Sequence, residues 1–275
     1  MKKAFVFLFA VLSASLITAQ EHQLIKLWQT DTLLKTPESA LFNPKNNFLY
    51  VSNINGALDA KDGNGSIGKV GLDGKIITVD WVKGLNAPKG MGLYNGKLWV
   101  ADLDEVAEIN TATATIEKRI PVKGATFLND IAVDGKGVVY VSDTRVKKVY
   151  SIENRQVNTL LSDLKGPNGL FVVGDDLYIL DNGALLKMSK DKKVAKIADG
   201  MEPSTDGLET VNGHDFLASC WVGAIYYVKA DGSKEKLLDT QAQKINSADI
   251  GFDPVKKIVY VPTFLKNSIT AYQLK

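Results

Sequence analysis

Short apolar runs alternate with turn-forming residues along almost the whole chain. Residues 166–191, GPNGLFVVGDDLYILDNGALLKMSKD, show the pattern clearly, because LFVV and LYIL are separated by GDD. Two apolar runs of this length on either side of a Gly/Asp turn predict an antiparallel hairpin. A helical period is nowhere sustained, so the pattern predicts an all-β protein.

The same hairpin outline occurs six times. The copies are PESALFNPKNNFLYVSN (37–53), PKGMGLYNGKLWVAD (88–102), LNDIAVDGKGVVYVSD (128–143), PNGLFVVGDDLYILD (167–181), TDGLETVNGHDFLASC (205–220) and ADIGFDPVKKIVYVPT (248–263). Two further strand-like segments follow a copy, for example KKVYSIEN and VNTLLSD after the third. A repeat of about 40 residues with four short strands predicts a six-bladed β-propeller.

The two ends of the chain predict how the ring closes. The last copy supplies only three strands, and one strand, LIKLWQT (24–30), is left over before the first full blade. We expect this strand to pair with the outside of the last blade, because an open sheet edge between the first and last blades would otherwise remain.

The first residues, MKKAFVFLFAVLSASLITAQ, have two lysines, an apolar run and then small residues. This order predicts a secretory signal peptide, residues 1–19, followed by one propeller domain, residues 20–275. We therefore expect cleavage after Ala19 and a periplasmic or secreted protein; a retained anchor is the alternative. No later segment is apolar for long enough to cross a bilayer.

Charge and cysteine content narrow the possible partners. The chain has 33 basic and 31 acidic residues, and removal of Lys2 and Lys3 leaves equal numbers. A near-neutral protein argues against nucleic acid or an anionic membrane as partner. Nothing in the sequence indicates an oligomeric state.

Cys220 is the single cysteine, so no internal disulfide is possible. We interpret Cys220 as a small buried residue rather than a nucleophile.

The second residue of each copy is polar. The innermost strand of each blade lines the channel of a propeller, so these six side chains are expected to converge at one mouth. The ring consists of Glu38, Lys89, Asn129, Asn168, Asp206 and Asp249. Burying such groups is costly unless something pairs with them. Carboxylate and amide oxygens are ligands that a hard cation such as Ca²⁺ prefers; a salt-bridge network around Lys89 is the alternative.

The motifs PESALF, FLND, GPNGL and STDGLE, in this order on successive blades, resemble the senescence marker protein/gluconolactonase/luciferin-regenerating enzyme-like family over residues 36–274. The resemblance implies a six-bladed propeller that holds a divalent cation, often Ca²⁺, at the channel mouth and hydrolyses lactones or related esters. It also implies ligand roles for Glu38, Asn129, Asn168 and Asp206. Asp206 is further implied to be the base or nucleophile.

Lys89 departs from the family pattern, because it brings an ammonium group into the ring. We expect it to pair with Asp249 or to contact substrate, which makes it a candidate catalytic residue; pairing with Glu38 or Asp206 would instead replace the metal ion. The ring has no histidine, and both histidines of the chain, His22 and His214, are expected in exposed loops.

Candidate substrate contacts come from the ring and from the ends of the second strands. They are Lys89, Asp249, Asn53, Asp102 and Trp221. For Asn53 and Asp102 the alternative is capping of the following turn, and for Trp221 it is packing on a neighbouring blade.

The sequence therefore predicts a metal-dependent hydrolase of a lactone or small ester, with Ca²⁺ as the expected cofactor and a small molecule as substrate. The cation would polarise the carbonyl while Asp206 activates water or attacks directly. The alternative is a non-catalytic propeller that binds a ligand or a protein partner at the same mouth.

Overall fold

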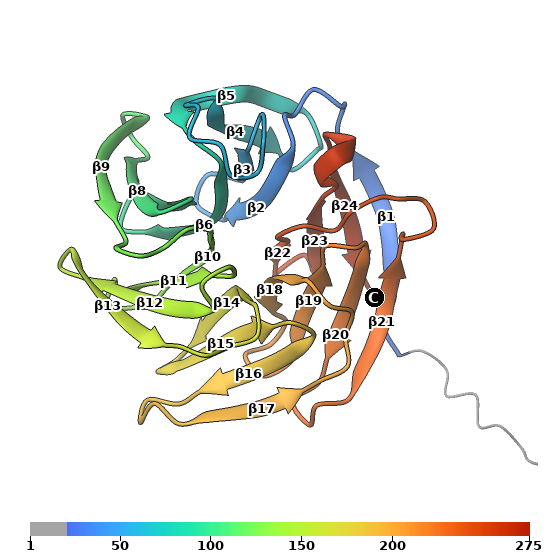
Figure 1. Cartoon of the computed structure of the whole chain (residues 1–275). Helices are drawn as coiled ribbons and strands as arrows, with labels where there is room; N and C mark the ends of the chain where they lie inside the picture. Colours follow the sequence, from blue (N-terminus) through green and yellow to red (C-terminus); the bar gives the residue numbers. More distant parts are fainter. Residues whose placement is uncertain (1–20) are drawn as a thin grey trace, which may run out of the picture.

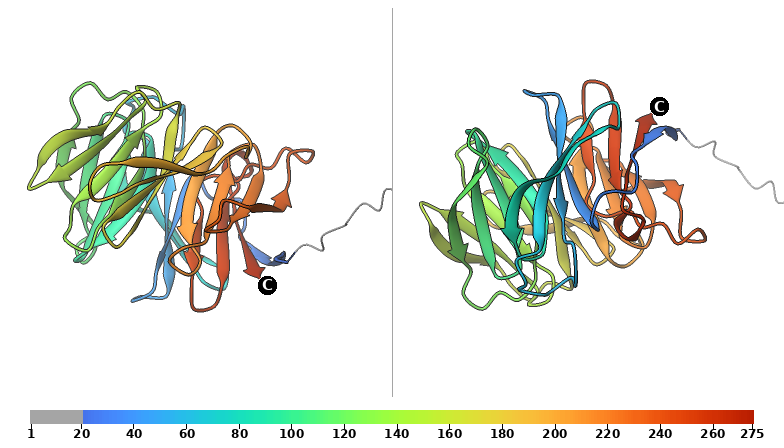
Figure 2. Two further views of the ribbon diagram at one scale, coloured as in Figure 1. Left: turned by 90° about the horizontal axis from the view of Figure 1, so that it is seen from below. Right: turned by 90° about the horizontal axis from the view of Figure 1, so that it is seen from above.

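The computed structural model describes residues 21–275, and the expected signal peptide, residues 1–19, lies outside the described residues. Six four-stranded antiparallel sheets surround a central channel (Figure 1). The predicted six-bladed β-propeller is therefore confirmed. Viewed from the side, the blades form a thick disc (Figure 2).

Each blade contributes its strands in order from the channel outwards. The innermost strands are β2 (Pro37–Asn43), β6 (Pro88–Tyr94), β10 (Leu128–Val133), β14 (Pro167–Val173), β18 (Thr205–Thr210) and β22 (Gly251–Asp253). The second strands are β3 (Phe48–Asn53), β7 (Lys97–Asp102), β11 (Val139–Asp143), β15 (Asp176–Asp181), β19 (Phe216–Cys220) and β23 (Ile258–Pro262).

The outer half of each blade is built in the same way. The third strands are β4 (Gly65–Gly71), β8 (Glu105–Asn110), β12 (Lys148–Glu153), β16 (Ala184–Met188), β20 (Ala224–Val228) and β24 (Ile269–Leu274). The outermost strands are β5 (Ile76–Leu85), β9 (Thr115–Pro121), β13 (Gln156–Leu161), β17 (Val194–Ala198), β21 (Lys234–Asp239) and β1 (Leu24–Gln29). One 3₁₀ turn, η1 (Phe264–Lys266), follows β23.

The ring closes through the leftover strand, as predicted. β1 pairs antiparallel with β24, from Leu24 opposite Leu274 to Gln29 opposite Thr270, and the two strands lie side by side in Figure 1. The Trp28 ring packs 5.9 Å from the Tyr260 ring of the same blade. The last blade is thus completed by residues more than two hundred positions away in the chain.

The hydrophobic core is divided among the interfaces between blades. Six apolar clusters each fill one interface, for example Leu180 with Phe216 between the fourth and fifth blades and Leu49 with Tyr260 between the first and last. Because both faces of an inner strand are covered by neighbouring blades, these strands appear in the sequence as apolar runs rather than strict alternations.

Glycines allow the inner strands to approach one another closely around the channel. A Cβ atom at Gly169 would lie 2.2 Å from the Asp206 carbonyl oxygen, and one at Gly251 would lie 2.0 Å from the Ala40 carbonyl oxygen. Both distances are too short for any side chain, so glycine at these positions permits the tight packing that defines the channel.

No helix within residues 21–275 is long and apolar enough to span a membrane.

Deleting residues 20–30 should strongly destabilise the propeller, because β24 would become an exposed edge and the Trp28 contact with Tyr260 would be lost. We expect the melting temperature to fall by about 10 °C or more. Leu33→Ser is a matched control, since Leu33 is 65% exposed and its replacement should change little. A truncated protein that melts with the parent would contradict the role of β1.

Candidate functional site

Five of the six predicted ring residues line one cavity at the mouth of the channel. The cavity has a volume of about 440 Å³. Its ring residues are Glu38, Lys89, Asn129, Asn168 and Asp206, and each is at most 8% exposed. The first five inner strands thus bring these side chains together as the repeat alignment predicts.

Asp249 does not belong to this ring, so its expected position was wrong by one residue. Ser39 and Asp249 form a parallel bridge, and the Asp249 amide donates to the Glu38 carbonyl oxygen at 2.9 Å. Asp249 is therefore level with Ser39, one residue deeper than Glu38, and Ala248 occupies the mouth level within an apolar cluster. The inner strand of the last blade is only three residues long, and the alignment began this copy at Ala248 instead of Ser247, one residue too late.

Burial and mutual repulsion disfavour the ionised forms of the two carboxyl groups at the mouth. Desolvation raises the pKa of Glu38 well above its ordinary value, and the nearby carboxyl groups of Asp206 and Asp249 raise it further. Desolvation also raises the pKa of Asp206, with Asp249 as the second cause. Neither group forms an ion pair within residues 21–275, so ionising both together is costly unless a cation enters.

Two polar atoms of the ring have no hydrogen-bond partner in the described part of the chain. They are Glu38 Oε2 and Asn168 Oδ1, both fully enclosed. Asn168 Nδ2 donates to Asp206 Oδ1 at 3.0 Å, which fixes the amide so that its oxygen is the free atom. A buried acceptor without a donor is unfavourable, and a ligand that accepts electron pairs would relieve both atoms.

Asn129 is oriented in a similar way. Its Nδ2 donates to Thr144 Oγ1 at 3.0 Å, and Thr144 Oγ1 in turn donates to the Pro167 carbonyl oxygen at 2.8 Å. This chain of hydrogen bonds engages the amide nitrogen, so the amide oxygen is the atom of Asn129 that is available to a ligand.

Lys89 forms neither of the ion pairs expected from the sequence. Its Nζ donates to the carbonyl oxygens of Leu58 and Ala87, each at 3.0 Å, and lies 4.4 Å from the centre of the Phe127 ring. Within the described residues it pairs with neither Asp249 nor a carboxylate of the mouth. Two carbonyls and an aromatic face stabilise the ammonium group instead. Its charge lowers the pKa values of Glu38 and Asp206 only from a distance, and burial outweighs this effect.

Lys89 also helps to hold a loop over the cavity. We call residues 54–64 the mouth loop; it connects the second and third strands of the first blade. Besides the Lys89 hydrogen bond to Leu58, Lys61 pairs with Asp104 at 2.6 Å and Asp59 pairs with Arg145 at 3.1 Å. These contacts attach the mouth loop to the second and third blades.

Most of the cavity walls come from a position of the repeat that the sequence analysis did not recognise, although it named Trp221. The residue directly after a second strand lines the cavity in four blades: Ile54, Thr144, Asn182 and Trp221. In the last blade Phe264, two residues after β23, lines it. Trp221 was predicted to wall the pocket or to pack on a neighbouring blade, and it does both, since its ring meets that of Phe264 edge-on at 5.6 Å.

Asn53 and Asp102, suggested as substrate contacts, are placed elsewhere. Both are fully buried, and neither lines the cavity. Asp102 accepts hydrogen bonds from the Asn86 and Ala87 amides at 2.8 to 3.0 Å, and Asn53 accepts one from the Lys35 amide at 3.1 Å. These side chains anchor the loop that leads into the inner strand, rather than capping the turn that follows the second strand, and the proposed site excludes them.

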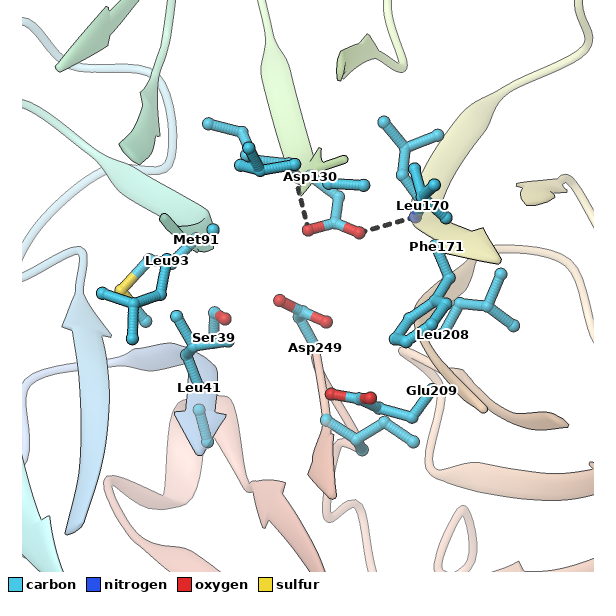
Figure 3. Close-up of a pocket in the computed structure, with 17 residues that line it drawn as sticks. Ser39, Leu41, Met91, Leu93, Asp130, Leu170, Phe171, Leu208, Glu209 and Asp249 are labelled. Atoms are coloured by element: carbon cyan, nitrogen blue, oxygen red, sulfur yellow. Dashed lines mark hydrogen bonds between the residues drawn. The ribbon is translucent and has the colours of Figure 1, made fainter. Parts of the chain in front are cut away.

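Further acidic groups lie deeper in the channel, around a second cavity of about 160 Å³. Figure 3 shows the carboxyl groups of Asp130, Glu209 and Asp249 directed into this space. Burial raises the pKa of Asp249 to about 7. Asp130 accepts hydrogen bonds from the amides of Ile131 and Leu170, both at 2.6 Å. The sequence analysis did not single out Asp130, although it directly follows Asn129 in the FLND motif.

Cys220 lies in the core, where burial raises the pKa of its thiol to about 12. A thiol that remains protonated at neutral pH is a poor nucleophile, which agrees with the structural role given to it from the sequence. His214 is exposed, as expected. His22 differs from the expectation, since its ring is half-buried and stacked on Tyr227.

The mouth thus combines two carboxyl groups and two amide oxygens around one cavity. All four groups offer oxygen atoms, two of which lack a partner, and this donor set fits a hard divalent cation. Glu38, Asn129, Asn168 and Asp206 are the residues that would hold it.

Comparisons with known proteins identify the architecture. No family model matches the chain, and no curated protein matches its sequence. A streptogramin B lyase superposes with a TM-score of 0.66 at 10% identity, covering 92% of this chain and 97% of that one. An inactive virginiamycin B lyase variant from Staphylococcus aureus, solved with quinupristin, gives 0.62 at 14% identity over 92% and 99%. A chain of the nidogen/laminin complex gives 0.66 at 16% identity over 79% and 84%. At these identities the likeness shows the propeller fold alone.

Without a bound cation, the protein should lose stability as the pH rises. The pKa of Asp249 is raised from 3.8 to about 7, and the pKa values of Glu38 and Asp206 are also raised. The folded protein therefore retains protons that the unfolded chain has released, so the free energy of unfolding falls between about pH 4 and about pH 7. Urea denaturation across this range in the presence of a chelator measures the effect.

Two variants separate this effect from the general titration of the surface. Asp249→Asn should reduce the pH dependence, whereas Asp191→Asn, on an exposed turn, should leave it unchanged. If the free energy of unfolding of the parent protein, measured with chelator, is constant or rises over this range, the carboxyl groups of the channel do not retain protons in the folded state and the prediction is wrong.

Proposed function

We propose that the protein is a metal-dependent hydrolase of lactones or small esters, with its active site at the channel mouth. The observation that supports this most directly is the pair of buried carboxyl groups, Glu38 and Asp206. Within residues 21–275, Glu38 Oε2 and the neighbouring Asn168 Oδ1 have no hydrogen-bond partner. The resemblance of the PESALF, FLND, GPNGL and STDGLE motifs to the senescence marker protein/gluconolactonase family supports the same activity.

In this proposal four side chains hold the cation: Glu38, Asn129, Asn168 and Asp206. The two carboxylates balance the charge of a divalent ion, and Ca²⁺ suits an all-oxygen ligand set. When bound, the cation supplies Lewis-acid polarisation of the substrate carbonyl group.

Asp206 is the proposed base or nucleophile. Its carboxylate is held in place by Asn168 Nδ2 at 3.0 Å, and it lines the cavity in which the substrate would bind. From this position it would take a proton from an attacking water or attack the carbonyl carbon directly. Lys89 would contribute by fixing the mouth loop rather than by proton transfer, because both of its short contacts are to backbone carbonyls.

The cavity has the size and composition of a small-molecule site. Its volume of about 440 Å³ falls within the range of ligand pockets. One part of its wall is apolar, formed by Leu58, Phe127, Trp221 and Phe264. Other lining residues are polar and include the exposed Lys165. A small ester would meet both apolar and polar side chains in this cavity.

The alternative proposal keeps the cavity but not the chemistry. A non-catalytic propeller would bind a ligand or a protein partner at the same mouth, a use supported by a solved neighbour that comes from a protein complex. The two proposals differ in their need for a cation. In both, the leader at residues 1–19 is proposed to direct export of the protein and to be removed after Ala19.

Replacing either carboxylate of the mouth should abolish the activity. Asp206→Asn is expected to lower the turnover of a responsive lactone by about a hundredfold or more. Glu38→Gln should weaken Ca²⁺ binding substantially, because half of the site's negative charge is lost. Calorimetric titration with Ca²⁺ and a lactone panel, with and without chelator, measure both effects.

Glu117→Gln is the matched control, because this exposed glutamate lies on an outer strand far from the channel, and its replacement should leave binding and turnover unchanged. A parent protein that binds no divalent cation would refute the proposed hydrolase. Hydrolysis that survives both Asp206→Asn and chelation would refute the assigned site.

Lys89→Met tests whether the ammonium group competes with the cation. Lys89 pairs with no carboxylate within residues 21–275, so we expect Ca²⁺ affinity to stay unchanged or to increase as a nearby positive charge disappears. Turnover should fall through loosening of the mouth loop. A parent that binds no Ca²⁺ and a variant that gains binding would favour the non-catalytic alternative.

A further inference from the structure

The ammonium group of Lys89 has a hydrogen-bond donor to spare. An ammonium group carries three N–H donors, and the carbonyl oxygens of Leu58 and Ala87 accept two of them. The third has no oxygen acceptor within residues 21–275, although the side chain lines the mouth cavity and the residue is only 2% exposed. The Phe127 ring attracts the charge, but an aromatic face is a weaker acceptor than an oxygen atom. A ligand oxygen in the cavity would therefore relieve a buried, unused donor.

Two of the acidic groups that act on Lys89 are engaged elsewhere. Burial lowers the pKa of the ammonium group, and Glu38, Asp102 and Asp59 oppose this effect. Asp59 forms an ion pair with Arg145 at 3.1 Å. Asp102 is fully buried and accepts hydrogen bonds from backbone amides. Neither of these two carboxylates is therefore a dedicated counterion for Lys89.

The proposed cation site would use the charge of the third group. Glu38 and Asp206 are the acidic residues that line the mouth cavity, and their two negative charges balance one divalent ion. No carboxylate of the cavity is then left to balance the Lys89 charge. One further negative charge, brought by the substrate, would compensate this buried cation.

We propose that the substrate of this site carries one carboxylate group, which accepts the third hydrogen bond of Lys89. This inference rests on the proposed hydrolase and narrows its substrate to a lactone or small ester with a single negative charge. A monoanion matches one buried positive charge, whereas a phosphate dianion would leave an excess negative charge in the cavity. Lys89 is then a specificity-determining residue as well as an anchor of the mouth loop.

Lys165 is the other cationic residue that lines the cavity. Unlike Lys89 it is exposed, so water and dissolved ions screen its charge. We expect its contribution to anion recognition to be small.

Two matched pairs of compounds measure the preference for a negative charge. The first pair is a γ-butyrolactone with a carboxylate on its ring and the same lactone with the uncharged carboxamide, compared by kcat/KM. The second is cyclopentanecarboxylate and cyclopentanecarboxamide, which contain no ester bond and are compared by calorimetric binding. With Ca²⁺ supplied, we expect the parent protein to prefer the anionic member of each pair by about tenfold or more, because a hydrogen bond between charged groups is stronger than one to a neutral acceptor.

Two variants of Lys89 assign the preference. Lys89→Met removes the charge and the donors, whereas Lys89→Gln removes the charge but keeps N–H donors for the mouth loop. Each variant should bind the anionic and neutral analogues about equally. Lys123→Met is the matched control, because Lys123 is exposed in the loop that leads into β10 and does not line the cavity; it should keep the preference, as should Lys165→Met. Melting curves show which variants remain folded.

Three results would overturn the proposal. The first is equal binding of the two analogues by the Ca²⁺-loaded parent. The second is an unchanged preference in a folded Lys89 variant, which would assign the carboxylate to the cation or to Lys165. The third is a loss of turnover in Lys89→Met that is equal for the two lactones, since fixation of the mouth loop would then explain it.

Failure of the proposed hydrolase gives a different result. A parent that binds Ca²⁺ and prefers the anionic analogue, but hydrolyses neither lactone, would support anion recognition by Lys89 and refute the chemistry. The cyclopentane pair tests the charge preference without any turnover, so the two failures are distinguishable.

Discussion

The repulsion among buried carboxyl groups in the channel is the interaction on which the account of this site depends. Within residues 21–275 no cationic side chain pairs with any of them. The groups concerned are Glu38, Asp130, Asp206, Glu209 and Asp249. Ionising several acids in a space that excludes water is unfavourable unless protons or a cation compensate them. Lys89, the buried cation of the ring, donates to backbone carbonyls instead, one of them in the mouth loop.

The propeller architecture maintains this unfavourable arrangement. Each inner strand is covered on both faces by apolar interfaces between blades, and glycines such as Gly169 and Gly251 let adjacent strands approach closely. Polar residues at the ends of the second strands, such as Asp102, fix the loops that enter the inner strands. Because β1 closes the ring, outward movement of one blade to relieve the repulsion would break contacts with both neighbouring blades.

The fold was predictable because its signal is repeated six times, so an error in any one copy does not change the conclusion. Five ring residues were predictable for the same reason. The sixth was not, because the last copy lacks the proline and glycine that flank the ring position in the fourth blade, Pro167 and Gly169. A parallel bridge to Ser39 sets the level of Asp249. Most of the walls, apart from Trp221, were missed because the polar ends of the second strands are conspicuous in the sequence, whereas the residues that follow them, such as Ile54 and Asn182, share no chemical type. The orientation of the Lys89 side chain depends on the mouth loop. The conformation of this loop follows from contacts with other blades, which no short sequence motif predicts.

The central claim is that the mouth carboxylates are arranged around a divalent cation. Crystals grown with Mn²⁺ as a substitute for Ca²⁺, and measured for anomalous scattering, test it most directly. The account predicts an anomalous peak at the mouth, in contact with oxygen atoms of Glu38, Asn129, Asn168 and Asp206. A map with no peak among these four side chains, or with peaks only elsewhere on the protein, would contradict it.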